Sequence, residues 1–266
     1  MEANKKLQIV DSLMQELDNY RPYSTEAINQ IWLNDSIEYI YNSEAIEGNT
    51  LTLRETVLIL KDGVTIGGKP LGYLLDTANH KDAYDFMLNF VERGNKYEDY
   101  SVEDIVLKLH EILKPHGLKE FEYGLYRYDE VKILGSTHTP PNADKVENLM
   151  KKYLNIAIKE QEPILKACNL HFYITEIHPF FDGNGRVARL AMNLFLRKDG
   201  YLPFNLKLEE KESYNQALEA SSLNNLKPFQ NWFLEKYLND CKKATQKLKQ
   251  YLSRQEEHII KNKISR

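Results

Sequence analysis

Residues 178–189 read HPFFDGNGRVAR, and this stretch decides how the rest of the chain is interpreted. It follows an apolar-faced segment, 164–177, that predicts a helix, and the proline after His178 ends that helix because a residue before proline disfavours helical geometry. The DGNG run is a tight loop whose glycines permit positive φ angles and a close approach of the backbone to a ligand. A second helix is predicted from about Gly185, with a buried apolar stripe made of Leu190, Ala191, Leu194 and Phe195. The loop therefore presents free backbone N–H groups at a helix N-terminus, which is a ready anion site.

The side chains of this stretch suit phosphate chemistry. Arg186 and Arg189 are three residues apart, so they share one face of the second helix, and two guanidinium forks beside an anion site suit a polyphosphate. Asp182 offers a carboxylate for a divalent cation, because Mg²⁺ is commonly held by one or two carboxylates together with phosphate oxygens. His178 has the ordinary pKa of a group that takes a proton from a hydroxyl at neutral pH. The pattern predicts phosphate-transfer chemistry with a histidine base.

With every specified position matched, residues 178–189 resemble the signature HPFx(D/E/N)GNGRxxR of the Fic (filamentation induced by cAMP) family. Residues 43–48, SEAIEG, resemble the inhibitory motif of that family, (S/T)xxxE(G/N). Residues 124–127, GLYR, together with 131–141, resemble its flap hairpin and the Pro-Pro that closes the flap. The resemblance spans roughly residues 37–238 and indicates the self-inhibited class, in which the inhibitory helix lies N-terminal to the core.

The resemblance implies a mainly α fold, namely a Fic-type helical bundle with a short β-hairpin flap over the active site. Apolar residues recur at helical spacing along most of the chain, which agrees with such a fold. The implied organisation has N-terminal helices over residues 1–36, a Fic domain over 37–238 and a charged helical tail over 239–266. Within the Fic domain, the inhibitory helix occupies about 36–48 and the flap about 130–139.

The resemblance also implies an activity. Most Fic proteins are protein adenylyltransferases (AMPylators), nucleotidyltransferases that move AMP from Mg-ATP onto a Ser, Thr or Tyr hydroxyl of a target protein. By resemblance, His178 is the general base and Asp182 holds Mg²⁺ against the phosphates. Arg186 contacts the β-phosphate and Arg189 the γ-phosphate. The other nucleotide-binding residues that the resemblance implies are Gly183, Asn184 and Gly185 around the phosphates and Tyr214 and Asn215 near the adenosine.

Self-inhibition is implied by the motif at residues 43–48. Glu47, in a motif that begins at Ser43, pairs with Arg189, so the guanidinium that the γ-phosphate needs is neutralised and ATP is misaligned. A charge-assisted pair of this kind is strong enough to compete for one arginine. The flap docks the target by strand addition, through main-chain hydrogen bonds. The docking segment of the flap comprises Ile133, Leu134, Gly135, Ser136, Thr137 and His138.

Three other functions stay open on the sequence. A de-AMPylase would use the same site, with Glu47 aligning a water molecule. A related transferase would use another phosphate-containing donor, although the complete GNGRxxR run favours a triphosphate. A non-catalytic nucleotide- or partner-binding module is the third, but such a module has no need of His178 as a base. The sequence also leaves open the target, self-modification and the formation of a homodimer.

Composition narrows the class of protein. The chain has 266 residues, of which 42% are hydrophobic and 28% charged, as in an ordinary soluble protein. Its 35 Lys and Arg against 39 Asp and Glu give a formal net charge of -4, so no basic excess points to nucleic acid. The N-terminus lacks the apolar core of a signal peptide, and the longest apolar stretch, near 187–196, is too short to span a bilayer. We therefore expect no membrane partner and a cytoplasmic protein.

The cysteines and the remaining histidines predict no further chemistry. Cys168 and Cys241 cannot form a disulfide framework, which agrees with a reducing compartment. His171 lies on a predicted helix and is expected to be structural. His110 and His116 have no metal-ligand partner at convincing spacing, and the sequence contains no zinc pattern.

Overall fold

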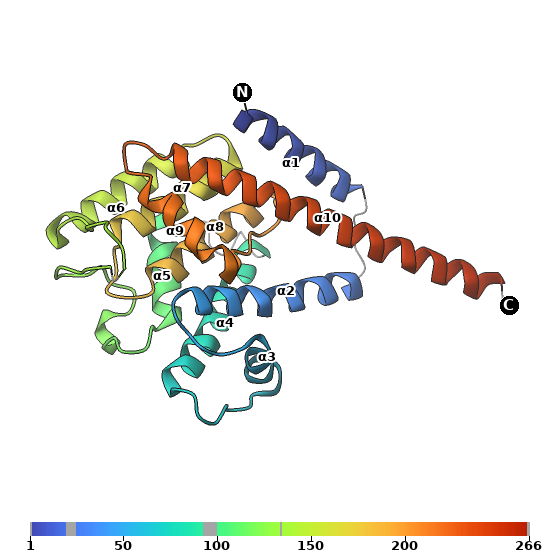
Figure 1. Ribbon diagram of the computed structural model, residues 1–266, viewed down its shortest axis with the longest axis horizontal. Coiled ribbons are helices and arrows are strands. Elements are labelled where there is room, and N and C mark those ends of the chain that lie inside the picture. Colours follow the sequence, from blue (N-terminus) through green and yellow to red (C-terminus); the bar gives the residue numbers. More distant parts are fainter. Residues whose placement is uncertain (1, 20–24, 93–99, 134, 265–266) are drawn as a thin grey trace. The chain divides into compact units, whose positions relative to one another are not determined.

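The computed structural model describes residues 2–19, 25–92, 100–133 and 135–264, and helices dominate them (Figure 1). The helices are α1 (Glu2–Asp18), α2 (Thr25–Ile46), α3 (Leu53–Asp62), α4 (Leu71–Glu92), α5 (Val102–Leu113), η2 (Glu120–Glu122), α6 (Ala143–Ile158), α7 (Pro163–Ile177), α8 (Asn184–Lys198), η3 (Leu208–Glu210), α9 (Lys211–Glu219) and α10 (Lys227–Ile264). Within these ranges, no helix combines the length and apolar character that crossing a bilayer requires. The prediction of a mainly α fold is confirmed.

The chain divides into two compact units, residues 1–34 with 233–266, and residues 35–232. The first unit pairs α1 with the later part of α10. Lys6 lies 3.9 Å from Glu235, and Lys249 forms an ion pair with Glu16. The second unit contains every residue that the sequence assigns to the site, and it is described below by itself.

The core of the second unit is built on α7 and α8. α7 packs against α8 and α6, and α8 also contacts α4 and α5, so α8 is central to this unit (Figure 1). Every residue of α8 from Arg186 to Leu196 is buried. Among them, Arg186 and Arg189 are each only 2% exposed. A buried charge must be paired and hydrogen-bonded to be tolerated, so the elements around α8 have to supply partners for both arginines.

Local sequence sets the helix ends that frame the site. α7 ends before Pro179, and His178 adopts a left-handed φ of 53° and donates its N–H to the carbonyl of Ile174 at 3.0 Å. α8 follows Gly183, whose φ of 81° is a conformation that glycine adopts without strain. The predicted break at His178 is confirmed, and α8 begins at Asn184, one residue before the predicted start.

The segment at about 36–48, which was predicted to be an inhibitory helix, corresponds to the C-terminal part of α2 and the two residues after it. This helix ends at Ile46, and Gly48, with a φ of 98°, donates its N–H to the carbonyl of Ala45 at 3.1 Å. Glu47 therefore lies directly after the last helical turn, on a backbone fixed by two short-range hydrogen bonds, the second being from its own N–H to the carbonyl of Glu44.

The β-hairpin predicted for the flap at about 130–139 is not confirmed, since none of the described residues in this segment forms a strand. Leu134 lies outside the described residues. The segment turns at Gly135, with a φ of 78°, and Ser136 donates its N–H to the carbonyl of Ile133 at 3.3 Å. We call residues 130–139 the flap segment.

Side chains take backbone groups that a hairpin ladder would use. Arg127, which is 2% exposed, donates to the carbonyl of Asp129 at 3.0 Å and to the carbonyl of Pro141, so it holds both ends of the flap segment. Near the turn, the carboxylate of Glu219 accepts the N–H of Thr137 at 3.4 Å. Backbone groups that are bound in this way are already satisfied without a partner strand.

Asn193 provides a test of how the chain after α8 is held. Its fully buried amide accepts the N–H of Phe204 at 2.7 Å and donates to the carbonyl of the same residue at 2.9 Å. Asn193→Ala leaves both backbone groups buried without these partners, so we expect the free energy of unfolding in urea to fall by about 2–4 kcal/mol. Asn155→Ala, at an exposed position of α6, is the control, with an expected change below about 0.5 kcal/mol. Equal losses in the two variants would contradict this account.

Candidate active site

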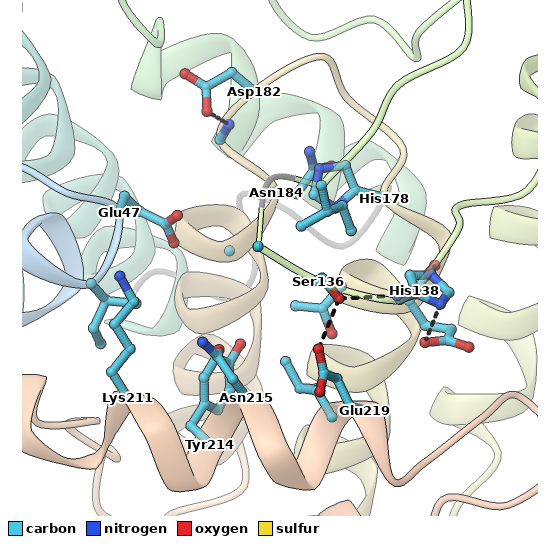
Figure 2. Close-up of a pocket in the computed structure, with 18 of the residues that line it drawn as sticks. Glu47, Ser136, His138, His178, Asp182, Asn184, Lys211, Tyr214, Asn215 and Glu219 are labelled. Carbon is cyan, nitrogen blue, oxygen red and sulfur yellow. Dashed lines mark hydrogen bonds and ion pairs between the residues drawn. The ribbon is translucent and has the colours of Figure 1, made fainter.

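A cavity of about 490 Å³ brings most of the predicted site residues together, although Ser43, Thr137 and Arg186 are not among the residues that line it. Its walls come from the end of α2, the flap segment, the end of α7, the loop before α8, and α9 (Figure 2). This volume lies within the usual range for small-molecule sites. The predicted site residues that line it are Glu47, Ile133, Gly135, Ser136, His138, His178, Asp182, Gly183, Asn184, Gly185, Arg189, Tyr214 and Asn215.

His178 enters the cavity from the end of α7. Its backbone is fixed by Arg127, whose Nε donates to the carbonyl of His178 at 2.9 Å. Burial lowers the pKa of His178 to about 4, although the nearby charge of Glu47 and a hydrogen bond to the backbone of Thr175 act in the opposite direction. The imidazole is therefore neutral at pH 7, which is the state that accepts a proton.

The loop before α8 is closed by Asn184. The side-chain oxygen of Asn184 accepts the N–H of Phe180 at 2.8 Å, and its amide nitrogen donates to the carbonyl of Phe180 at 2.9 Å. The side chain is thus engaged within the loop, which agrees with the expectation that Asn184 contributes to the phosphate site largely through its backbone. What remains for a ligand is the backbone of Asn184 and its neighbours, at the N-terminus of α8.

Arg189 donates three hydrogen bonds to residues at the end of α2. Its Nε donates to the hydroxyl of Ser43 at 2.8 Å, and one terminal nitrogen donates to the Ser43 carbonyl at 3.0 Å and to a carboxylate oxygen of Glu47 at 2.7 Å. The predicted pairing of Glu47 with Arg189 is confirmed. The side chain of Glu47 keeps 37% of its surface exposed, whereas Arg189 is buried, so the acid is the partner that is free to leave.

Gly185 allows this approach. A Cβ atom at Gly185 would lie 2.3 Å from a carboxylate oxygen of Glu47 and 3.0 Å from a terminal nitrogen of Arg189. Burial raises the pKa of the Glu47 carboxyl, but the charges of Arg189 and Arg186 outweigh burial and lower it below its ordinary value. Glu47 is therefore an anion seated against the first turn of α8, where a phosphate is expected to bind.

Arg186 is held by three carboxylates, two of which sequence reasoning missed. Its guanidinium lies 3.2 Å from Asp182, 3.2 Å from Asp76 on α4, and 3.6 Å from Glu44 on α2. Glu44 in turn accepts a hydrogen bond from Nδ1 of His80 at 2.7 Å. Arg186 is therefore held in place by carboxylates from both α2 and α4.

The spacing of the sequence contains a signal for Glu44. Glu44 precedes Glu47 by three residues, and Arg186 precedes Arg189 by three, so the C-terminal end of α2 and the residue after it meet the first turns of α8 in two acid–arginine pairs. Asp76 has no such signal, because only the fold brings α4 to Arg186.

Asp182 is the one carboxylate of the loop itself. Its side chain is 48% exposed, with one oxygen accepting the N–H of Gly183 at 2.6 Å and the other facing Arg186. Among the described residues, no group of three or more His, Cys, Asp or Glu side chains surrounds a common metal position. A single accessible carboxylate beside a phosphate site is nevertheless a donor set that fits Mg²⁺, which takes its remaining oxygens from phosphate and water.

One face of α9 forms another wall of the cavity. Figure 2 shows Lys211, Tyr214, Asn215 and Glu219 rising from this helix. Tyr214 is only 5% exposed and its hydroxyl lies 3.3 Å from Nε2 of His171, so the ring supports the wall from within. Lys211 was missed, although it lies one turn before Tyr214 and adds a cation to the cavity.

The flap segment is attached to α9 and α7. The hydroxyl of Ser136 donates to Glu219 at 3.2 Å, close to the Thr137 contact already described (Figure 2). Nε2 of His138 lies 2.8 Å from the carbonyl of Glu176, near the end of α7. His138 therefore donates to the backbone beside the site, and its side chain lines the cavity.

The fold and the site define a mainly helical domain in which a glycine loop, a neutral histidine and Arg189 line one cavity, with Arg186 buried next to the loop. Residues 100–196 of this domain match the model of the Fic/DOC family. Two solved structures share the fold. Fic-1 (residues 134–508) from Caenorhabditis elegans superposes with a TM-score of 0.79 at 25% identity, covering 94% of this chain and 73% of that one. A Fic domain containing signaling protein from Bacteroides thetaiotaomicron gives 0.78 at 24% identity, covering 92% and 97%.

Curated relatives are similar over most of this chain. It is 31% identical over 229 residues to protein adenylyltransferase fic-1 of Caenorhabditis elegans, covering 85% of this chain and 44% of the relative. It is 29% identical over 212 residues to protein adenylyltransferase Fic of Drosophila mojavensis, covering 78% and 40%. The chain thus spans less than half the length of these relatives.

The carboxylate of Glu44 predicts a pH-dependent contribution to stability. Burial alone would raise its pKa, but the charge of Arg186 and the hydrogen bond from His80 outweigh burial and bring the pKa to about 2. A carboxyl whose pKa is lower in the folded state stabilises the fold above its ordinary pKa, and this stabilisation is lost as the pH falls toward the folded value. We expect Glu44→Gln to lower the free energy of unfolding by roughly 3 kcal/mol at pH 7 and by progressively less between pH 5 and pH 3.

Urea unfolding followed by circular dichroism across this pH range measures the difference. Glu209→Gln, at an exposed position in η3, is the matched control and should leave the free energy of unfolding nearly unchanged. A Glu44→Gln deficit that stays constant from pH 7 to pH 3 would refute the electrostatic explanation.

Proposed function

We propose that the protein is a protein adenylyltransferase that transfers AMP from ATP to a Ser, Thr or Tyr hydroxyl of a target protein. The observation that carries the proposal is the convergence of His178, the N-terminus of α8 and Arg189 on one cavity, with Arg186 buried alongside. The names of the curated relatives, protein adenylyltransferase, agree with it.

In the proposed reaction, the neutral ring of His178 takes the proton of the target hydroxyl as its oxygen attacks the α-phosphorus. A new bond forms between that oxygen and phosphorus, and the bond between the α-phosphorus and its bridging oxygen to the β-phosphate breaks. Pyrophosphate leaves with the electron pair of the broken bond. The lowered pKa of His178 favours the unprotonated ring at neutral pH, and Arg127 fixes its backbone position.

The phosphates are proposed to lie along the first turns of α8. Backbone N–H groups of residues 183–185 donate to them, Arg186 contacts the β-phosphate and Arg189 the γ-phosphate. Asp182 would hold Mg²⁺, which when bound would neutralise part of the triphosphate charge. Asn215 and Lys211 lie on the wall of α9 where the nucleoside would be accommodated.

Glu47 is proposed to be the inhibitory group. It binds Arg189 at 2.7 Å and occupies the space beside Gly185, so a γ-phosphate can reach Arg189 only after Glu47 withdraws. Charge-assisted hydrogen bonds contribute about 1.5–3 kcal/mol, which corresponds to roughly 10–100-fold in an equilibrium. Inhibition of this strength is substantial and reversible.

The flap segment is proposed to dock the target protein through its backbone. The N–H of Thr137 donates to the carboxylate of Glu219 in this structure. When a target strand docks, a main-chain carbonyl of the target would replace that carboxylate as the acceptor. Docking of this kind makes few contacts with the side chains of the target. The flap segment could therefore bind targets of different sequence.

Substituting Glu47 tests the proposal. Incubating purified Glu47→Gly protein with Mg²⁺ and ATP labelled on the α-phosphate, with cell lysate added as a source of targets, should label protein at least about tenfold more than wild type does. Glu47→Gly combined with His178→Ala should abolish the labelling, because no base is left for the hydroxyl. Thr50→Gly, in the same connection between α2 and α3, controls for added backbone freedom and should stay at the wild-type level. Measurable binding of ATP without any labelling would reject AMP transfer.

The metal requirement is tested separately. Labelling by the Glu47→Gly protein should disappear when EDTA removes the divalent cation and return when excess Mg²⁺ is added. Glu47→Gly combined with Asp182→Asn, which keeps the size of the side chain and removes its charge, should raise the Mg²⁺ concentration that gives half-maximal labelling. Labelling that persists in EDTA would exclude the assigned role of Asp182.

A further inference from the structure

His110, on α5, is a buried histidine that the proposed reaction does not use. It is fully buried, and its ring stacks on Phe180 of the 178–189 stretch with centroids 3.8 Å apart and planes 3° from parallel. An apolar aromatic ring would provide the same stacking. The question is therefore what the two ring nitrogens do.

Both nitrogens of His110 are hydrogen-bonded, and the partners fix their roles. Nδ1 lies 2.9 Å from the backbone N–H of Gly124, which can only donate, so Nδ1 accepts and carries no proton. Nε2 lies 3.2 Å from the carbonyl oxygen of Asp182, which can only accept, so Nε2 carries the proton. The ring is thus a neutral bridge between the 124–127 segment, which leads to the flap, and the loop before α8.

The contact with Asp182 has a geometric consequence for the next residue. In a trans peptide the carbonyl and the following N–H point in opposite directions. Because His110 draws the Asp182 carbonyl toward α5, the N–H of Gly183 points away from α5, where it donates to the Asp182 carboxylate at 2.6 Å. That N–H is the first of the backbone donors at the N-terminus of α8.

The loop rests on the same end of α5. A Cβ atom at Gly183 would lie 2.8 Å from Cγ of Pro115 and 3.5 Å from a ring carbon of His110. Gly183 therefore touches the support directly, and its φ of 81° requires the absence of a side chain. Pro115 blocks a shift of the loop toward α5, and His110 resists rotation of the peptide away from it.

We propose that His110 is a positioning residue of the phosphate site: its Nε2–H holds the Asp182 carbonyl and thereby turns the Gly183 N–H, which donates to the Asp182 carboxylate in this structure, toward the side of the loop where the phosphate would bind. The inference rests on the proposed nucleotide site and adds a residue outside the 178–189 stretch to it. His110 touches no reacting atom, so its substitution changes the affinity for phosphate and leaves the nucleoside contacts intact.

Three variants separate positioning from packing, all made in the Glu47→Gly protein so that Arg189 is available. His110→Phe keeps the aromatic stack and removes both hydrogen bonds. His110→Gln places an amide donor near the position of Nε2, and His110→Asn places an acceptor near the position of Nδ1 and has no donor that reaches Asp182. Calorimetry with ADP and ligand-observed NMR with adenosine, each at the same fraction of folded protein, provide the readouts.

The dissociation constant for ADP should rise about tenfold in His110→Phe, the effect of one hydrogen bond, while that for adenosine stays unchanged. His110→Gln should recover most of the ADP affinity and His110→Asn should not. Equal ADP affinity in the parent and His110→Phe, or a parallel loss of ADP and adenosine binding, would overturn the proposal. If His110→Phe does not fold, the Gln and Asn variants decide, and equal ADP affinities in those two would reject it. A parent protein that binds no nucleotide would instead reject the proposed function.

Discussion

Two guanidinium groups inside a helical bundle have to be neutralised, and the architecture around α8 follows from that requirement. Arg186 and Arg189 are each 2% exposed, and leaving either charge unpaired would cost several kcal/mol. Ser43, Glu44 and Glu47 at the end of α2 supply polar and charged partners for the two arginines, and Asp76 on α4 supplies another. These elements are tied to α8 by charge as well as by apolar packing. The same contacts hold Arg189 in a fixed position at the cavity and Arg186 in a fixed position beside it, so a phosphate would meet preoriented donors.

The sequence predicted those parts of the site whose geometry is local. The break at His178, the glycine loop and the two arginines on one face of α8 all depend on residues within a dozen positions, so helical period and the properties of Gly and Pro suffice to place them. The pairing of Glu47 with Arg189 is long-range and was predicted only because residues 43–48 resemble a known motif. Glu44 repeats the same three-residue spacing and was overlooked.

Other features depend on contacts that no local pattern encodes. The flap was expected to be a hairpin because residues 131–141 resemble the flap of a known family, but the buried Arg127 and the carboxylate of Glu219 take backbone groups there. His110 was set aside for lack of a metal partner, since its bonds to Gly124 and Asp182 arise from three separate segments. Backbone-to-side-chain hydrogen bonds of this kind appear only once the fold is known.

The missing side chain at Gly185 links regulation to affinity. The carboxylate of Glu47 occupies the space beside Gly185, and in the proposed reaction a phosphate oxygen would take that same space. Nucleotide then selects the fraction of molecules in which Glu47 has withdrawn, and its apparent dissociation constant is the intrinsic constant divided by that fraction. A partner that binds the end of α2 and moves Glu47 away from Arg189 would increase the affinity for ATP without contacting the nucleotide. By the same linkage, ATP would increase the affinity for that partner.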